Sequence, residues 1–457
     1  YGDDPASSPS ASTLTIPIHF PILTLASRAC PMRNSKEVSM MHKRVGCILL
    51  AITTALVVLF LNANQNGFAL SEETTPLSQQ YVILSEEELL DRIYGGWVGM
   101  LIGGLEGLPH EFKYVEKPSP TLPEFTFLAN GARSDDDNDI EWLHLWFMHQ
   151  KGTLKIPYDE LPAIWKANMN QGVWVANKRA RELMDVGIVP PLTGSIEHNP
   201  HAWYNLAGQF CVESYGLIAP GMPQTAADIG LHYARISVSQ EPLQATQFWT
   251  TLISRAFVLS LSTRELLEDA LSAVDQRSDM AHAIRDAIAA HQKYPTDWKA
   301  ARNEIHQRWY KARGWNANSV IVNGAAVCLA LLYGDGDFYQ TLRYAMAIGY
   351  DADCNAATAG TVVGVRWGFR RISEHPQFRM PDRYQNRTRP QLPQEMRVSE
   401  QANILLQLAR KVIVEQGGEV MQKDGQIYYR IRQQEPKLLE PLPEVVKRPT
   451  PKDKAPS

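Results

Sequence analysis

The sequence has few cysteines, little net charge and only short apolar runs. Five of its 457 residues are cysteines, and Cys211, Cys328 and Cys354, the three that lie beyond the first fifty residues, are mostly far apart. Three cysteines form at most one bridge within a chain, which excludes a disulfide framework. The formal charge is −4, and no dense Lys/Arg block with interleaved aromatics occurs. We therefore expect no nucleic-acid partner.

The first 69 residues differ in composition from the rest. Residues 1–40 are rich in Ser, Pro and Thr without helical or strand period, which predicts an upstream extension. A short basic segment at 42–44 then precedes an apolar run of 14 residues, 48–61. A helix needs about 20 residues to cross a bilayer, and Gly67-Phe68-Ala69 is small at the two positions that matter for cleavage. We predict a signal peptide over 41–69, export to the periplasm or outside the cell, and no stable membrane anchor after its removal.

The rest of the chain has the pattern of an all-α domain. Apolar residues recur with helical period, linkers are rich in Gly, Pro and Asn, and alternating β-type stretches are nearly absent. We expect one catalytic domain over 70–432, followed by a loosely attached Pro/Lys/Glu-rich tail over 433–457. The expected helices span 86–95, 139–150, 158–169, 225–237, 245–261, 263–273, 280–291, 296–313, 320–333, 337–348 and 400–416.

Four aspartates crowd into five positions just ahead of one of these helices: Asp135, Asp136, Asp137 and Asp139. One carboxylate is enough to cap a helix N-terminus. Four like charges in one turn repel one another unless a cation compensates them. Oxygen ligands suit hard ions such as Mg²⁺, Mn²⁺ or Ca²⁺, and the chain lacks the Cys/His spacing of a zinc site. A solvated helix cap is the alternative for this segment alone.

A second acidic pair, Asp351 and Asp353, opens the segment GYDADCNAATAGTVVG at residues 349–364. The residues that follow the pair are mostly small, so the helix they form can approach a neighbouring helix closely. Packing against a second helix would hold both acidic ends in register. Two carboxylate clusters at one place are suited to a two-metal centre, with the ions about 3.5–4 Å apart.

Five segments, in their order and spacing, resemble the ADP-ribosylglycohydrolase family over roughly residues 85–415. The resemblance implies an all-α orthogonal helical bundle with two Mg²⁺ ions, or Mn²⁺ in their place, in a central cleft. In the family the ions grip vicinal hydroxyls of a ribose and hold a water that cleaves the bond at the anomeric carbon. The five segments are 95–112, 134–139, 215–230, 323–338 and 351–360.

The resemblance also implies the metal ligands. Asp351 and Asp353 match the late acidic motif of the family. The early motif fits in two registers, and we favour the one in which Asp136 and Asp137 are the paired ligands and Asp135 replaces a hydroxyl ligand.

Glu111 falls where relatives have a mobile glutamate that works near the metals as an acid/base or water-positioning group. Its alternative is a surface carboxylate after a helix, and we prefer it to Glu106, which suits a helix face. Cys354 stands where many relatives have Thr or Ser; its thiol would be a poor Mg²⁺ ligand and is expected to line the site. The predicted substrate contacts are Glu213, Tyr215, Asn323, Cys354 and Asn355, with a helix cap as the alternative for Asn323.

The chain departs from the family pattern near the substrate side of the cleft. Gly103-Gly104 stands where relatives commonly have Gly-Asp, and Gln240 stands where they have His. These departures bear on the substrate, as does export, because ADP-ribosyl groups derive from intracellular NAD. We predict an exported metal-dependent glycohydrolase that cleaves an N- or O-glycosidic bond of an ADP-ribosyl or related small-molecule or glycosyl substrate. A non-catalytic binding or structural protein of the same fold is the alternative.

Overall fold

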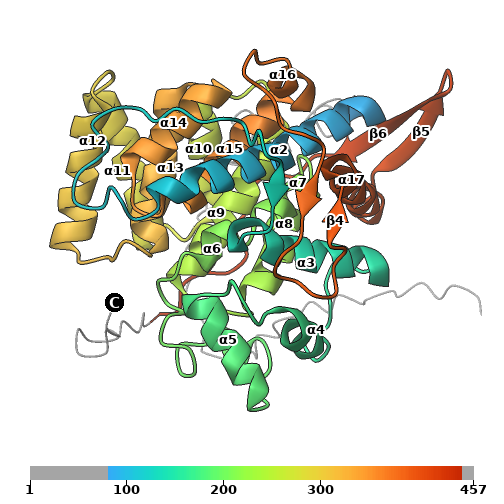
Figure 1. Ribbon diagram of the computed structural model, residues 1–457, viewed down its shortest axis with the longest axis horizontal. Coiled ribbons are helices and arrows are strands. Elements are labelled where there is room, and N and C mark those ends of the chain that lie inside the picture. The colour runs from blue at the N-terminus through green and yellow to red at the C-terminus, as the bar shows by residue number, and fades with distance from the viewer. Residues whose placement is uncertain (1–80, 445–457) are drawn as a thin grey trace, which may run out of the picture. The chain divides into compact units, whose positions relative to one another are not determined.

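The structure is a computed structural model that describes residues 81–444 (Figure 1). The predicted signal peptide lies outside the described residues, as does the end of the predicted tail. Within 81–444 the chain is mostly helical with two small sheets, so the all-α prediction is confirmed. None of the helices in this part of the chain combines the length and the apolar character that a membrane span needs. Cys211, Cys328 and Cys354 are all free and buried.

The bundle consists of helices of very different length, joined by loops, short 3-10 turns and one π-helical segment. The α-helices are α2 (Glu86–Gly107), α3 (Asp136–Lys151), α4 (Leu161–Asn168), α5 (Val175–Asp185), α6 (Ala207–Phe210), α7 (Glu213–Leu217), α8 (Pro223–Ala234), α9 (Glu241–Ala256), α10 (Thr263–Ala270), α11 (Asp279–Lys293), α12 (Trp298–Ile305), α13 (Val320–Gly334), α14 (Phe338–Ile348), α15 (Ala352–Trp367), α16 (Phe369–Ser373) and α17 (Val398–Glu415). The other turns are η2 (Leu108–His110), η3 (Leu192–Gly194), η4 (Leu271–Ala273) and the π-helix η5 (His306–Ala312).

Helices α2 and α15 pack against each other along a line of small residues (Figure 1). A Cβ atom built on Gly99 would lie 2.1 Å from the carbonyl oxygen of Gly360, and one built on Gly103 would lie 2.0 Å from that of Ala356. Real Cβ atoms do not approach a backbone oxygen so closely, so the two backbones touch only because these side chains are absent. The small residues predicted on α15 thus serve an antiparallel contact with α2.

Helix α2 is longer than its predicted range, 86–95. It begins at Ser85, whose side chain accepts a hydrogen bond from the Glu88 backbone N–H at 3.1 Å, as expected of a helix cap. Glycine has low helix propensity, yet the Gly-rich stretch up to Gly107 stays helical because it is buried against α15. The helix therefore continues to η2, and Glu111 follows directly behind that turn.

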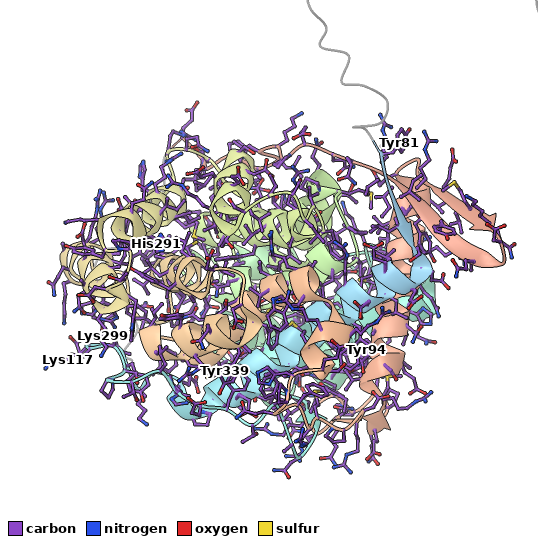
Figure 2. The ribbon with its side chains drawn as sticks, turned by 90° about the horizontal axis from the view of Figure 1, so that it is seen from above. Tyr81, Tyr94, Lys117, His291, Lys299 and Tyr339 are labelled. Atoms are coloured by element: carbon purple, nitrogen blue, oxygen red, sulfur yellow. The ribbon has the colours of Figure 1, made fainter. Side chains whose placement is uncertain are left out.

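Two small sheets complete the fold. In one, β6 (Gln426–Arg432) lies between β1 (Tyr81–Ser85) and β5 (Glu419–Lys423), all antiparallel, and Figure 2 shows β1 from Tyr81 onward beside this hairpin. In the other, β2 (Ala132–Arg133) pairs in parallel with β3 (Tyr384–Gln385), which pairs with β4 (Glu395–Met396). The second sheet fixes the backbone that leads into the aspartate-rich start of α3.

The described part of the predicted tail is not loosely attached. Beyond β6 the chain lies against the bundle: Gln247 Nε2 donates to the Glu440 carbonyl at 3.0 Å, and the Leu442 backbone N–H donates to Asp275 Oδ2 at 2.9 Å. The side chain of Leu442 is buried. These contacts could not be predicted from the Pro/Lys/Glu-rich composition, because a single buried apolar residue and a few backbone hydrogen bonds leave no periodic pattern in the sequence.

Candidate metal centre

A cavity of about 470 Å³ lies where the starts of α3, α5 and α15 meet the loop after η2. Its wall carries six carboxylates together with apolar and aromatic side chains. The lining residues are Leu108, Glu111, Phe112, Asp135, Asp136, Asp137, Trp174, Val175, Asn205, Phe210, Asn318, Asp351, Asp353 and Cys354. The predicted catalytic glutamate and the five predicted metal-ligand aspartates therefore all line one cavity.

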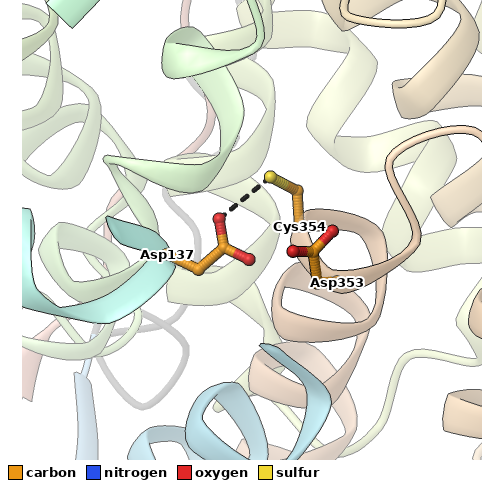
Figure 3. Close-up of side chains that lie close together, drawn as sticks. All are labelled: Asp137, Asp353 and Cys354. Carbon is orange, nitrogen blue, oxygen red and sulfur yellow. Dashed lines mark hydrogen bonds between the residues drawn. The ribbon is translucent and has the colours of Figure 1, made fainter. Parts of the chain in front are cut away.

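Asp353 is the residue that two smaller groups share. Ligand-type atoms of Glu111, Asp351 and Asp353 lie within 4.8 Å of one another, and so do those of Asp137, Asp353 and Cys354. Figure 3 shows the second group, with Asp137 from α3 facing Asp353 and Cys354 on α15. The two helix starts therefore bring their carboxylates together, and Asp353, which belongs to both groups, would help to hold a divalent cation there.

Of the described carboxylates of this cavity, Asp135 has a cationic partner, Arg133 at 3.6 Å, whereas the deepest ones are left without a partner for one oxygen. Within residues 81–444, Asp137 Oδ2 and Asp353 Oδ1 are buried without a hydrogen-bond partner. Burial and the neighbouring carboxylates raise the pKa of Asp137 well above its usual range, and burial and the nearby Glu111 raise the pKa of Asp353 to about 7. A buried, crowded carboxylate with a free oxygen is stabilised when a cation supplies the missing charge. The residues present thus fit a hard divalent ion.

Cys354 contributes a proton rather than a ligand to this arrangement. Its Sγ donates to Asp137 Oδ1 at 2.9 Å (Figure 3). Burial and the adjacent Asp137 raise the pKa of the thiol well above its usual range, so it stays neutral. A neutral thiol is a poor partner for a hard cation, and it orients Asp137 instead.

Asp139, the fourth aspartate of the run, does not line the cavity. It accepts hydrogen bonds from Arg389 and Thr388, which tie α3 to the loop after β3. Glu106 is also engaged elsewhere, because it accepts from the Leu128 backbone N–H at 2.8 Å. The preference for Glu111 over Glu106 therefore agrees with where the two carboxylates lie.

Four of the five residues predicted to contact substrate are fully buried and absent from the cavity wall: Glu213, Tyr215, Asn323 and Asn355. Tyr215 pairs its hydroxyl with His144 Nδ1 at 2.9 Å in the core. Asn323 Oδ1 accepts from the Asp351 backbone N–H at 3.1 Å and from Asn355 Nδ2 at 2.8 Å. Asn323 and Asn355 thereby hold the start of α15, so their place in the structure suits positioning of Asp351.

Glu213 belongs to a second, separate acidic pair behind the cavity. Its Oε1 accepts from Thr358 Oγ1 at 2.6 Å, and its neighbour Glu141 accepts from the Ser214 backbone N–H at 3.1 Å. Burial and the Glu213 charge raise the pKa of Glu141 well above its usual range. At least one of the two is therefore protonated in the folded protein, since two buried carboxylates in contact cannot both ionise. The pair ties α3, α7 and α15 together.

Seven residues of the cavity wall were not predicted from the sequence: Leu108, Phe112, Trp174, Val175, Asn205, Phe210 and Asn318. Asn318 Nδ2 donates to Asp351 Oδ2 at 3.3 Å, which gives that ligand candidate its second fixed partner. Asn205 Nδ2 in turn donates to Asn318 Oδ1. A single Asn between helices carries no sequence signal of this role.

The metal-free protein should lose stability with rising pH because of these carboxylates. An acid whose folded pKa is raised keeps its proton in the folded state after the unfolded chain has released it. For Asp353 the pH range of this loss runs from the usual aspartate pKa, near 4, to its raised pKa of about 7. We therefore expect Asp353→Asn to raise the melting temperature in EDTA, by an amount that grows between pH 4 and 7 and is constant above.

The difference between variant and wild-type melting curves isolates this effect from other titrating groups, such as buried histidines. Excess Mg²⁺ at pH 8 should raise the melting temperature of the wild type and do so far less for Asp353→Asn. A pH-independent difference between the two proteins in EDTA would contradict the prediction.

The fold and this cavity define an all-α protein with an acidic cleft suited to divalent cations. The model of the ADP-ribosylglycohydrolase family matches residues 85–410, and the chain belongs to this family. Membership supports a glycohydrolase-like function. A solved structure described as an ADP-ribosylglycohydrolase-related protein complex is similar at 18% identity with a TM-score of 0.48, covering 71% of this chain and 99% of that chain. A comparison with curated proteins found no match.

Proposed function

We propose that the protein is a divalent-metal-dependent glycohydrolase that cleaves an N- or O-glycosidic bond of an ADP-ribosyl or related sugar substrate. The observation that carries this proposal is the convergence of six carboxylates on one cavity, two of them with buried oxygens that have no hydrogen-bond partner within residues 81–444. A purely structural role would need cationic side chains to pair with these carboxylates; none of the described residues of the wall is cationic, and Arg133 beside the wall pairs with Asp135.

Asp137, Asp351 and Asp353 would hold Mg²⁺ or Mn²⁺, with Asp135 and Asp136 beside them. Bound there, the ions would supply positive charge for vicinal hydroxyls and a Lewis acid for the reacting oxygen. Cys354 and Asn318 keep two of these carboxylates in place through the bonds to Asp137 and Asp351.

Glu111 is the residue we assign to proton transfer. It is the exposed member of its carboxylate group, follows directly after η2 and lines the cavity. Burial, together with Asp351 and Asp135, raises its pKa to about 7. A carboxyl group that titrates near neutrality can take a proton from water or give one to a leaving group.

The test is an assay of ADP-ribosyl-arginine, ADP-ribosyl-serine, nucleosides and aryl glycosides with Mg²⁺, with Mn²⁺ and with EDTA. We expect hydrolysis of at least one substrate, dependent on metal. Glu111→Gln should lower kcat by about 100-fold or more, the usual contribution of a general acid or base, and leave the melting temperature nearly unchanged. Absence of hydrolysis across the panel with either metal would contradict the proposal.

A matched control for Glu111→Gln is Glu87→Gln, on the exposed start of α2 far along the helix from the cavity. It removes one carboxylate of the same type and should leave kcat unchanged. If both variants lose activity equally, Glu111 has no special role. Export of the protein, predicted from residues 41–69, is part of the same proposal and is tested by fractionating cells that express the full chain.

A further inference from the structure

The residue just ahead of Asp351 has an unusual backbone conformation. Tyr350 lies in the left-handed region with φ of +63°, directly after Gly349 with φ of +87°. This conformation is costly for a residue as bulky as tyrosine, and it persists only where the surrounding structure holds it in place. Because Asp351 follows at once as the cap residue of α15, the backbone at Tyr350 sets the direction in which the Asp351 side chain leaves the chain.

Contacts of the phenol group hold Tyr350 in this conformation. The side chain is buried, its hydroxyl pairs with His306 Nδ1 at 3.0 Å, and the Arg302 guanidinium carbon lies 4.6 Å from the centre of its ring. Burial and the nearby Arg302 lower the pKa of His306 to about 4, so its imidazole is neutral near pH 7 and can accept a hydrogen bond from the hydroxyl. The ring is therefore fixed both by a directional hydrogen bond and by packing.

The backbone of Tyr350 contacts the loop that follows η2. Its carbonyl accepts a hydrogen bond from the Phe112 N–H at 2.8 Å, and its own N–H donates to the Tyr114 carbonyl at 3.4 Å. A Cβ atom built on Gly349 would lie 2.2 Å from that same Tyr114 oxygen, so the two segments are in direct backbone contact. The loop directly after Glu111 therefore lies against the segment that leads into α15.

Arg302, on α12, connects the same two segments through its side chain. The guanidinium donates to the carbonyl of Ile348 at 3.2 Å, to that of Tyr114 at 2.9 Å and to that of Val115. The side chain is buried. A planar guanidinium has its donors in fixed directions, so it also fixes the carbonyls that it binds relative to one another.

We propose that Tyr350 is a positioning residue that sets Asp351 and Glu111 for binding of a divalent cation. The buried Arg302 and His306 hold its conformation, and none of the three lines the cavity, so they act through the backbone. This inference rests on the proposed function, because it assigns these residues to the same metal centre. If residue 350 leaves the left-handed region, Asp351 turns away from the other carboxylates, and the loop of Glu111 loses its hydrogen bonds to the segment before α15.

The test compares the loss of two buried tyrosine hydroxyls. Tyr350→Phe keeps the ring and removes the hydrogen bond to His306. Tyr233→Phe, on α8, is the matched control, because its buried hydroxyl accepts from the Ile156 N–H at 3.1 Å and the residue does not line the cavity. Both variants should lower the melting temperature, since each leaves a buried polar group without its partner. Only Tyr350→Phe should weaken Mg²⁺ binding, by about 10-fold, the usual effect of losing a group that orients a metal ligand. Calorimetric titration below both melting temperatures measures this affinity.

A second measurement does not depend on the metal. In the metal-free protein, the amide hydrogen of Phe112 should exchange faster in Tyr350→Phe than in the wild type, and Tyr233→Phe should leave its exchange unchanged. Arg302→Lys, which keeps the charge but not the planar fork, should speed this exchange and weaken Mg²⁺ binding as well, and it carries both measurements if Tyr350→Phe does not fold.

The outcomes separate this inference from the proposed function. Unchanged Mg²⁺ affinity in Tyr350→Phe, or an equal loss of affinity in Tyr233→Phe, overturns the inference while the metal centre stands. Absence of Mg²⁺ binding by the wild type overturns both. Whether the wild type hydrolyses any glycoside is read separately and bears on the proposed function alone.

Discussion

Asp351→Asn is expected to abolish glycoside turnover while the fold is retained. Asp351 is buried, belongs to the carboxylate group with Glu111 and Asp353, and is held from two directions by Asn318 and Asn323. Asparagine has the same shape but brings no charge to a cation. Loss of an outer-shell partner alone costs a metal site about 10–100-fold in affinity or activity, so loss of a ligand should cost more than about 100-fold in kcat/KM.

The measurement pairs steady-state kinetics with calorimetric titration of Mg²⁺ into the metal-free protein. Asp136→Asn should behave in the same way, because Asp136 lines the cavity from α3. Asp228→Asn, on the exposed face of α8, is the control and should keep full activity. Full turnover in both cavity variants would refute the assignment of a metal centre and with it the proposed mechanism.

Local patterns were sufficient to predict the bundle and the acidic half of the site. Asp135, Asp136 and Asp137 precede one amphipathic segment, and Asp351 and Asp353 precede another, so that both clusters fall at helix starts. A run of adjacent carboxylates can be recognised from the sequence, because the repulsion between neighbouring charges in one helical turn does not depend on the tertiary structure. The structure brings these starts together at one cavity.

The apolar half of the site could not be predicted in the same way. Phe112 and Trp174 are single aromatic residues in irregular loops, and only the tertiary contacts of those loops bring them to the cavity mouth. Glu213 and Tyr215 were predicted to contact the substrate, and that prediction does not agree with where their side chains lie. Their position before a Pro-Gly turn suggested access to a ligand, but both side chains are buried behind the wall because α7 packs between α8 and α9.

The sequence also did not identify the helix that packs against α15. Small residues after Asp353 predicted a close helix contact, and the structure assigns it to α2. The Gly residues of α2 repeat every fourth position, from Gly95 to Gly107, and match small residues of α15 in antiparallel order. Because α2 leads into the Glu111 loop and Asp353 lies in the first turn of α15, this contact sets the separation between those two carboxylates.

Gly103→Ala is accordingly expected to lower both stability and activity. Its Cβ would lie 2.0 Å from the backbone oxygen of Ala356, which cannot rotate away, so the two helices must separate. Overpacking of a tight core usually costs about 1–3 kcal/mol, and a clash with backbone places this variant at about 3 kcal/mol or more. Urea unfolding measures the loss, and kcat/KM measures the displaced carboxylates.

Gly104→Ala provides the matched control one residue further along the same helix. The nearest atom to its Cβ is Asp137 Cβ at 3.5 Å, an ordinary van der Waals contact. Alanine is also a better helix former than glycine by about 1 kcal/mol, so this variant should be as stable as the wild type or more so. Equal stability of Gly103→Ala and Gly104→Ala would mean that α2 and α15 can move apart freely. The close backbone contact would then not be what holds Glu111 and Asp353 at one cavity.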